Sequence, residues 1–282
     1  MTVVPILLYH SVSATPPEWI APLAVTPRVF ARHLDVIAAS GRTTLTVSQL
    51  RAALLTGAEL PERPVVLTFD DGFADFVDAV GELAARQLPS TLYVTTGALR
   101  GRGCPAPHLV LPPAPMLSWS QLAELPEQGV EIGAHSHTHP QLDVVAPKVA
   151  AEEMRHSKRL LEDTLGSVVS SFAYPYGFQS ATVRRLARAA GYTSACAVIN
   201  ALSSPTDDPF ALARLTVRAD TDPARLRAWL AGADARIAPC PERMRTRAWR
   251  LYRRLGFTDI IRGYHFAGDP RAFAILGRAL PL

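Results

Sequence analysis

The sequence predicts an α/β protein with parallel strands, arranged either as a barrel or as an open doubly wound sheet. Two observations predict this class. Short apolar runs rich in β-branched residues alternate with segments of helical periodicity, as in successive βα units. One run, 65–69, is apolar and β-branched almost throughout, which is typical of a strand buried on both faces. In either architecture we expect the chemistry at the C-terminal ends of the strands.

Most of the expected elements have a local signal. Thr26 and Pro27 provide an N-cap and a first-turn proline for the first helix, and Ser118 with Gln121 fits a capping box. The proline-rich stretch 101–117 is expected to form an irregular lip over the site. The expected strands are 3–9, 65–69, 91–94, 130–133, 171–173 and 193–198. The expected helices are 27–40, 75–86, a short one after Ser118, 146–165 and 180–190.

Composition and cysteine usage indicate an ordinary soluble globular protein. Hydrophobic residues make up 48% of the chain and charged residues 19%, which excludes a disordered chain. Cys104, Cys196 and Cys240 are widely spaced and odd in number, so we expect free thiols in a reducing compartment. No apolar run approaches the roughly 20 residues of a membrane span, and 3–9 lacks the flanks of an export signal. We therefore expect a cytoplasmic protein without a membrane partner.

The positive charge is concentrated in the C-terminal part of the chain. The net charge of the whole chain is +4. Residues 236–282 hold ten arginines and three acids, which is a net charge of +7, so residues 1–235 have a net charge of −3. We interpret this difference as two modules, 1–235 and 236–282. No base-reading motif accompanies the arginines, so we expect no nucleic-acid partner.

Polar clusters follow three of the predicted strands. The first, Thr68-Phe69-Asp70-Asp71-Gly72, places two carboxylates side by side. Neighbouring side chains of an extended chain point in opposite directions, so one Asp could bind a metal while the other acts as a base. A plain Asp-Gly turn is the alternative for this segment.

The second cluster, His135-Ser136-His137-Thr138-His139, holds three of the chain's eight histidines. Neutral imidazoles are common ligands of zinc-like metals. His135 and His139 converge if the chain turns helically, whereas all three converge if it stays extended. A solvated polar loop is the alternative. The third cluster, 172–177, taken alone fits an aromatic-proline turn packed on the mouth of a barrel.

These clusters resemble the motifs of carbohydrate esterase family 4, the polysaccharide deacetylases with the NodB-homology fold. Thr68-Phe69-Asp70-Asp71-Gly72 matches the first motif, His135-Ser136-x-x-His139 the second, and 173–177 resembles the third. The resemblance covers about residues 3–230 and implies an irregular (β/α)7-type barrel, followed here by a short C-terminal helix-hairpin appendage. The activity it implies is metal-dependent hydrolysis of the N-acetyl amide of acetylated amino sugars, with release of acetate.

Carried over by position, the resemblance implies Asp70 as the general base. It implies Asp71, His135 and His139 as ligands of a divalent metal. Zinc is the expected ion, and cobalt, nickel, iron and manganese are the alternatives that such a donor set accepts.

Further roles in the site follow from the same resemblance. The backbone N–H of Tyr176 is implied to hold the oxyanion, and Ser136 to brace the histidine loop. His137 lies at a variable position of the motif and receives no ligand role.

The chain departs from the family pattern in two places. The third motif usually has an Arg that steadies the base, and here Ala173 stands in its place. Arg214 could substitute for it, with a surface salt bridge as the alternative. The usual Leu-x-His near the end of the domain, which supplies the general acid, is missing, whereas Leu8-Tyr9-His10 follows the first strand. This order is similar to that of circularly permuted deacetylases of biofilm exopolysaccharides and implies His10 as the acid, with a core histidine as the alternative.

Two other functions stay open at this point. The absence of an export signal favours a deacylase of a non-sugar amide metabolite. The missing motif arginine favours a catalytically impaired metal- or acyl-binding protein. Release of acetate from acetylated sugars distinguishes the sugar deacetylase from both.

The tail is expected to form a basic helix, 241–255, stopped by Gly256, and two strands, 257–266 and 272–276. The stretch 248–257 resembles the last helix and strand of GNAT acetyltransferases, in which the helix tyrosine, here Tyr252, can act as an acid. That family's Gly-rich pyrophosphate loop is absent, so no coenzyme A site is expected. A lone hairpin needs cover, and we expect the tail to dock on the barrel or to join a homo-oligomer.

Overall fold

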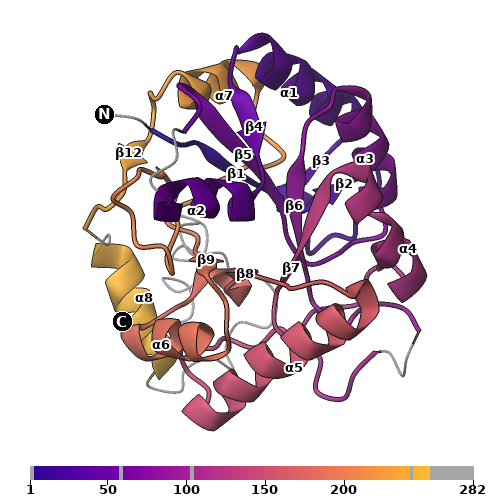
Figure 1. Ribbon diagram of the computed structural model, residues 1–282, viewed down its shortest axis with the longest axis vertical. Helices are drawn as coiled ribbons and strands as arrows, with labels where there is room; N and C mark the ends of the chain where they lie inside the picture. The colour runs from indigo at the N-terminus through magenta and orange to yellow at the C-terminus, as the bar shows by residue number, and fades with distance from the viewer. Residues whose placement is uncertain (1–2, 57–59, 102–104, 242–243, 255–282) are drawn as a thin grey trace, which may run out of the picture.

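The protein is a parallel α/β barrel, which confirms the predicted fold class. The computed structural model describes residues 3–56, 60–101, 105–241 and 244–254. A curved parallel sheet lies at the centre, and helices surround it (Figure 1). No helix in these described ranges is long and apolar enough to cross a membrane.

The central sheet contains eight strands in the order β11-β1-β5-β6-β7-β8-β9, with β4 beside β5. All of its pairs are parallel. The strands are β1 (Ile6–Tyr9), β4 (Thr43–Leu45), β5 (Pro64–Phe69), β6 (Ser90–Val94), β7 (Val130–Ala134), β8 (Ser171–Ala173), β9 (Ser194–Cys196) and β11 (Leu215–Thr216). Two small parallel pairs lie outside this sheet: β2 (Ser11–Val12) with β3 (Ala24–Val25), and β10 (Ala201–Leu202) with β12 (Arg236–Ile237).

One short segment joins the two ends of the sheet and decides between a barrel and an open sheet. Leu212 forms a parallel bridge with Cys196 of β9. Three residues later, Leu215 of β11 pairs with Leu7 of β1. The first and the last strands are therefore neighbours, and Arg214 lies at the closure between them.

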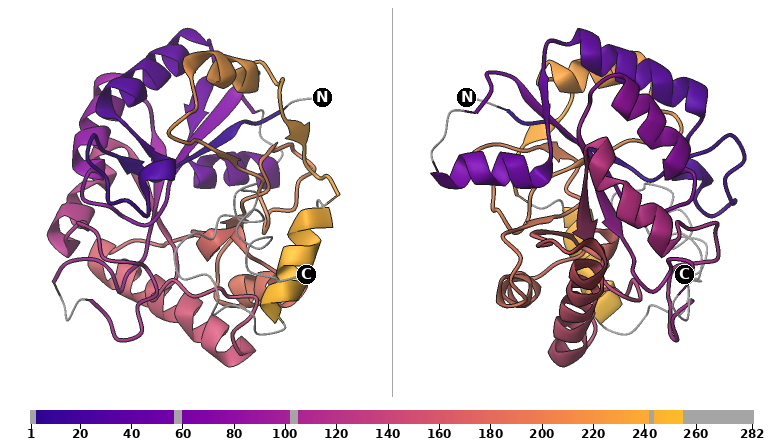
Figure 2. Two further views of the ribbon diagram at one scale, coloured as in Figure 1. Left: turned by 180° about the vertical axis from the view of Figure 1, so that it is seen from behind. Right: turned by 45° about the vertical axis from the view of Figure 1, so that its right-hand side comes forward.

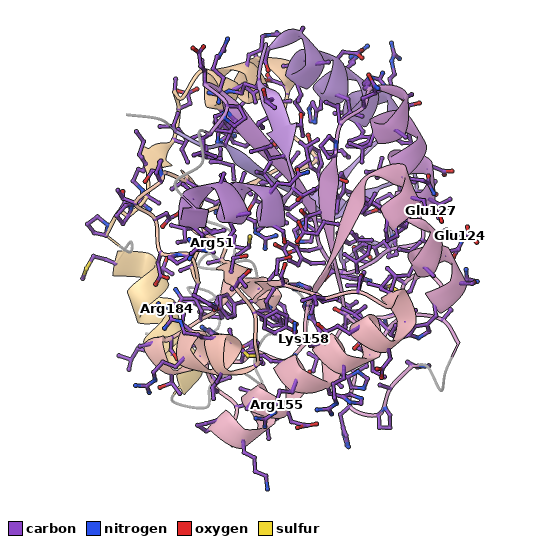
Figure 3. The ribbon with its side chains drawn as sticks, in the orientation of Figure 1. Arg51, Glu124, Glu127, Arg155, Lys158 and Arg184 are labelled. Carbon is purple, nitrogen blue, oxygen red and sulfur yellow. The ribbon has the colours of Figure 1, made fainter. Side chains whose placement is uncertain are left out.

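Helices cover the outer face of the sheet. Thr26 caps the first of them, since its Oγ1 accepts from the backbone N–H of Val29, and Ser118 and Gln121 form the predicted capping box. Charged side chains such as Glu124 and Arg155 lie on the outside of this layer (Figure 3). The helices are α1 (Pro27–Ala39), α2 (Val47–Thr56), α3 (Phe76–Ala85), α4 (Trp119–Glu124), α5 (Pro147–Leu165), α6 (Ala181–Ala189), α7 (Pro223–Leu230) and α8 (Met244–Arg254).

Helix α2, which the sequence analysis did not predict, lies across the barrel (Figure 1). Val47 and Leu50 pack in one apolar cluster with residues such as Val66 from the barrel interior. The backbone N–H and hydroxyl of Ser48 donate to Glu131 near the start of β7, at 2.9 and 2.8 Å. Helix α2 thereby covers the end of the barrel from which the strands start, and the chemistry lies at the other end.

The described part of the tail is helix α8, which lies against the barrel beside α6 (Figures 1 and 2). Trp249 of this helix is buried against Phe178. Docking on the barrel is thus observed for the helix. The expected strands 257–266 and 272–276, with Gly256, lie outside the described residues. The division into 1–235 and 236–282 and the homo-oligomer stay predictions.

Candidate active site

The polar clusters come together where the strands of the barrel end. Asp70 and Asp71 directly follow β5, and His135 directly follows β7. Tyr176 lies in the 3-10 turn after β8, and its ring centre is 4.7 Å from that of His139. The motifs therefore form one site, because the C-terminal ends of parallel strands share one edge of the sheet.

Asp71, His135 and His139 form a buried cluster with the geometry of a metal site. One ligand atom of each lies within 4.8 Å of the other two. Nε2 of His135 is 3.5 Å, and Nε2 of His139 3.2 Å, from Oδ1 of Asp71. Among the described residues, no lysine or arginine forms an ion pair with Asp71. A buried carboxylate requires a compensating charge, and a divalent cation between these three groups would supply it.

The protonation of His135 suits a metal ligand. Burial lowers the pKa of His135 to about 4, although the neighbouring aspartates oppose this shift, so its ring is neutral at neutral pH. Nδ1 lies 2.8 Å from the carbonyl oxygen of Ala173. A carbonyl can only accept, so the proton is assigned to Nδ1 and the lone pair at Nε2 faces Asp71.

His139 completes the fit of the donor set to a divalent metal. The side chain is buried, and its Nδ1 has no hydrogen-bond partner among the described residues. Two imidazole nitrogens and one carboxylate oxygen leave coordination positions open for a substrate, as in catalytic sites of zinc-like metals. The residues present therefore fit the metal that the sequence analysis expects, while the identity of the ion stays a prediction.

Asp70 has a different partner from its neighbour. Arg214 donates from Nη1 to Oδ1 and from Nη2 to Oδ2, each at 2.7 Å. Burial would raise the pKa of Asp70, but Arg214, together with His135 and His10, outweighs this effect and holds the pKa below its ordinary value. Arg214 is completely buried, so the alternative of a surface salt bridge is wrong. The arginine thus contacts the aspartate for which the resemblance implies the role of base.

The backbone at Asp70 and Asp71 differs from the sequence-based expectation. An extended chain that points the two carboxylates in opposite directions is wrong, because Asp71 has a φ of 78°. This left-handed conformation lets both carboxylates approach one imidazole, with Nε2 of His135 3.7 Å from Oδ2 of Asp70. His139 and Tyr176 also have positive φ values, 62° and 59°. Such strained conformations in non-glycine residues are typical of functional sites.

The contact between Arg214 and Asp70 makes a pH-dependent prediction. Arg214→Met removes the group that lowers the pKa of Asp70, and burial remains, so this pKa rises. A base must be deprotonated to act, and the acid limb of the kcat/KM profile therefore moves to higher pH. The unpaired buried carboxylate costs about 3–5 kcal/mol of unfolding free energy at neutral pH. This cost becomes smaller as the pH falls and Asp70 takes up a proton.

The profile and urea unfolding curves of Arg214→Met measure these effects. The matched control is Arg184→Met, which removes an arginine whose partner, Asp208, is on the surface. An acid limb that does not move, in a variant shown to be folded, contradicts the assignment of Arg214.

His10 lies beside this site, as the permuted order predicts. It follows β1, which pairs with β11 on one side and β5 on the other. Burial lowers the pKa of His10, and the charges of Asp71 and Asp70 oppose this shift without cancelling it. The imidazole is thus close enough to both aspartates for their charges to act on it. Its role stays a prediction.

The histidine loop is held by several contacts. The hydroxyl of Ser136 accepts from the backbone N–H of His139 at 3.1 Å. The carboxylate of Glu153 on α5 accepts from the backbone N–H groups of His137 and Thr138, each at 2.8 Å, and from the Thr138 hydroxyl at 2.7 Å. Glu153 was not predicted from the sequence. The sequence feature that could have identified Glu153 is its position between buried residues of the α5 helix.

His137 points away from the metal cluster, in agreement with the absence of a ligand role. Its Nδ1 is 2.9 Å from the hydroxyl of Thr96, and its ring packs edge-on against His156. The described part of the expected lip lies next to this loop, since the backbone N–H of Val110 donates to the carbonyl of Thr138 at 2.8 Å.

Glu153→Ala is expected to weaken metal binding without touching a ligand. The loop that carries His135 and His139 loses three hydrogen bonds, and loss of such supporting contacts typically costs about 10-fold or more in metal affinity. A zinc competition titration with a chromophoric chelator measures the dissociation constant. Glu152→Ala is the control, because this neighbouring acid pairs with surface arginines. Equal zinc affinities for the two variants contradict the bracing role.

The parallel barrel with paired aspartates and two histidines at its strand ends defines a hydrolase of the deacetylase type. The family model of polysaccharide deacetylases matches residues 57–195. The chain belongs to this polysaccharide deacetylase family. It is 26% identical over 214 residues to the putative polysaccharide deacetylase YxkH of Bacillus subtilis, a match that covers 76% of this chain and 71% of that protein.

Solved structures have the same fold. The Streptococcus pyogenes deacetylase PplD, in complex with acetate, matches with a TM-score of 0.70 and 26% identity over 80% of this chain and 96% of that one. IcaB from Ammonifex degensii matches with a TM-score of 0.68 and 23% identity over 82% of this chain and 97% of that one.

A different relative matches only a short segment. Thirty-six residues, 13% of this chain, are 97% identical to a GCN5-like protein acetyltransferase of Mycobacterium tuberculosis. This chain spans 18% of that protein's length. So short a match does not carry the activity of the acetyltransferase.

Proposed function

We propose that the chain is a metal-dependent N-deacetylase that hydrolyses the acetamide of acetylated amino sugars. One observation carries the proposal. Two neighbouring buried carboxylates have separate partners: Asp70 pairs with Arg214, and Asp71 lies against His135 and His139. The first carboxylate is held as an oriented anion, and the second belongs to a metal-ligand set.

The ligands of the metal would be Asp71, His135 and His139, and a bound divalent ion would supply Lewis-acid chemistry. The other residues act on protons and on the charge that develops. Asp70 accepts the proton of the attacking water, and Arg214 keeps its carboxylate ionised and oriented. The backbone N–H of Tyr176 donates to the carbonyl oxygen as it becomes negative.

His10 is proposed to complete the reaction. The C–N bond of the acetamide breaks when the departing nitrogen receives a proton, and His10 is the donor. Burial lowers the pKa of His10, which makes the protonated ring a stronger acid, and the charges of Asp71 and Asp70 partly oppose this shift. The products are acetate and the free amine of the sugar.

The assignment of Arg214 bears on the competing functions. A catalytically impaired binding protein was favoured by the missing motif arginine, and a buried guanidinium now contacts the base in its place. The family match and the presence of acetate in the complex of PplD also support deacetylation. A non-sugar amide stays the second substrate class.

Elemental analysis of the purified protein, together with an acetate-release screen, tests the proposal. The screen covers N-acetylglucosamine, short and long oligomers of it, and non-sugar acetamides. We expect about one divalent ion per chain and acetate release from the acetylated sugars. If acetate is released from the non-sugar acetamides alone, the substrate class is the non-sugar amides. Full activity after the metal is stripped overturns the mechanism.

A further inference from the structure

Arg253 on helix α8 makes a buried, two-pronged contact with the barrel. Its Nη1 and Nη2 donate to Oδ1 and Oδ2 of Asp143, each at 2.9 Å, and Nη1 also donates to Oε1 of Gln141 at 3.0 Å. The side chains of Arg253 and Asp143 are almost completely buried. The deacetylase mechanism described above uses neither of them.

The guanidinium of Arg253 also contacts the turn after β8. Its central carbon lies 3.4 Å from the ring centre of Phe178. Trp249, one turn earlier on α8, packs against the same ring. Arg253 therefore bridges two separate loops, one reached through hydrogen bonds and the other through an aromatic ring.

Both loops carry groups of the candidate active site. Gln141 lies two residues after His139, and Phe178 lies two residues after Tyr176. The rings of Tyr176 and Phe178 are stacked with their centres 5.8 Å apart, and the ring of His139 meets that of Tyr176 at 4.7 Å. A continuous set of contacts thus runs from Arg253 to a proposed metal ligand and to the proposed oxyanion donor.

We propose that Arg253 is a positioning residue that sets the distance between the histidine loop and the Tyr176 turn. A buried ion pair contributes little net stability against its desolvation cost, but its fork geometry restricts the partners to one arrangement. Helix α8 then contributes to the geometry of the active site. This inference rests on the proposed function for its kinetic consequences, and on the metal-ligand cluster for its binding consequences.

The test uses Arg253→Lys and Arg253→Met in the full chain. Lysine keeps a charge opposite Asp143 but loses the planar fork, so this variant retains the fold and loses the geometry. Arg227→Met is the control, because it removes an exposed arginine from helix α7. The readouts are the zinc dissociation constant by chelator competition, kcat and KM for acetate release, and the folded fraction by circular dichroism.

We expect kcat of both Arg253 variants to fall about 10- to 100-fold while KM stays within about twofold, because misplacement of reacting groups by an ångström has effects of this size. We expect zinc affinity to fall about 10-fold. Arg253→Lys values within twofold of the unmodified protein overturn the proposal. A loss of kcat and of zinc binding that equals the unfolded fraction of the variant also overturns it.

The design separates this proposal from the proposed function. If the unmodified protein releases no acetate from any acetylated sugar, the sugar deacetylase fails. The zinc dissociation constants of the Arg253 variants then decide the positioning role by themselves, since they require no substrate.

Discussion

Asp70→Asn is expected to lower kcat for acetate release by about three to four orders of magnitude, since the amide cannot take the proton of the attacking water. Zinc is expected to stay bound at one ion per chain, because the proposed ligands are Asp71 and the two histidines. Acetate release at saturating substrate and elemental analysis of the same sample measure the two effects.

The stability of this variant needs its own measurement. Arg214 loses its anionic partner in the substitution, and a buried unpaired guanidinium lowers the unfolding free energy. Rates are therefore corrected for the folded fraction. Asp78→Asn, on the exposed side of α3, is the control and should leave kcat within about twofold. An Asp70→Asn enzyme with kcat near that control contradicts the role of the base.

His135→Ala is expected to lose the metal and, with it, nearly all acetate release. His135 provides one of three ligand groups, and its removal leaves two. We expect zinc affinity to fall by at least about 100-fold, more than for loss of a supporting contact. Chelator treatment of the unmodified enzyme should give the same inactive state, which added zinc reverses, whereas His135→Ala stays inactive at that zinc concentration.

His137→Ala is the matched control for this substitution. It removes an imidazole from the same loop, but one whose ring packs against His156 and whose Nδ1 lies beside Thr96. We expect one zinc ion per chain and kcat within a few-fold of the unmodified enzyme. Loss of zinc from both variants to the same extent contradicts the assignment of His135 and His139 as the ligand pair.

The part of the site that the sequence predicts consists of residues close together along the chain. Asp70 and Asp71 belong to one motif and His135 and His139 to another, and each follows a strand with a clear apolar pattern. Parallel strands bring their C-terminal ends together whatever the details of packing, so these residues meet in the structure as expected. Arg214 was a candidate only as a substitute for the arginine that the third motif lacks, and its contact with Asp70 could not be derived from the sequence.

Some elements were missed because their local signal is weak. Strand β4 has three residues, one exposed and two partly buried, and it has no alternating pattern long enough to identify a strand. Helix α2 faces the barrel end with a mixture of Val47, Leu50 and the polar Ser48, since it covers both an apolar interior and Glu131. A mixed face of this kind does not produce the periodicity of an amphipathic helix.

The amino-acid pattern was sufficient for the fold class and for the strand ends that carry the polar clusters, because these depend on short-range periodicity. The proposed metal-ligand set came from the resemblance of two contiguous motifs to a known family. Tertiary structure decided which arginine contacts the base, which acid braces the histidine loop and where the tail helix docks. Arg214 and Asp70 are 144 positions apart, and Arg253 and Asp143 are 110 apart. Pairs so distant in the chain meet only when the barrel closes and the last helix packs on it, and no local pattern encodes that closure.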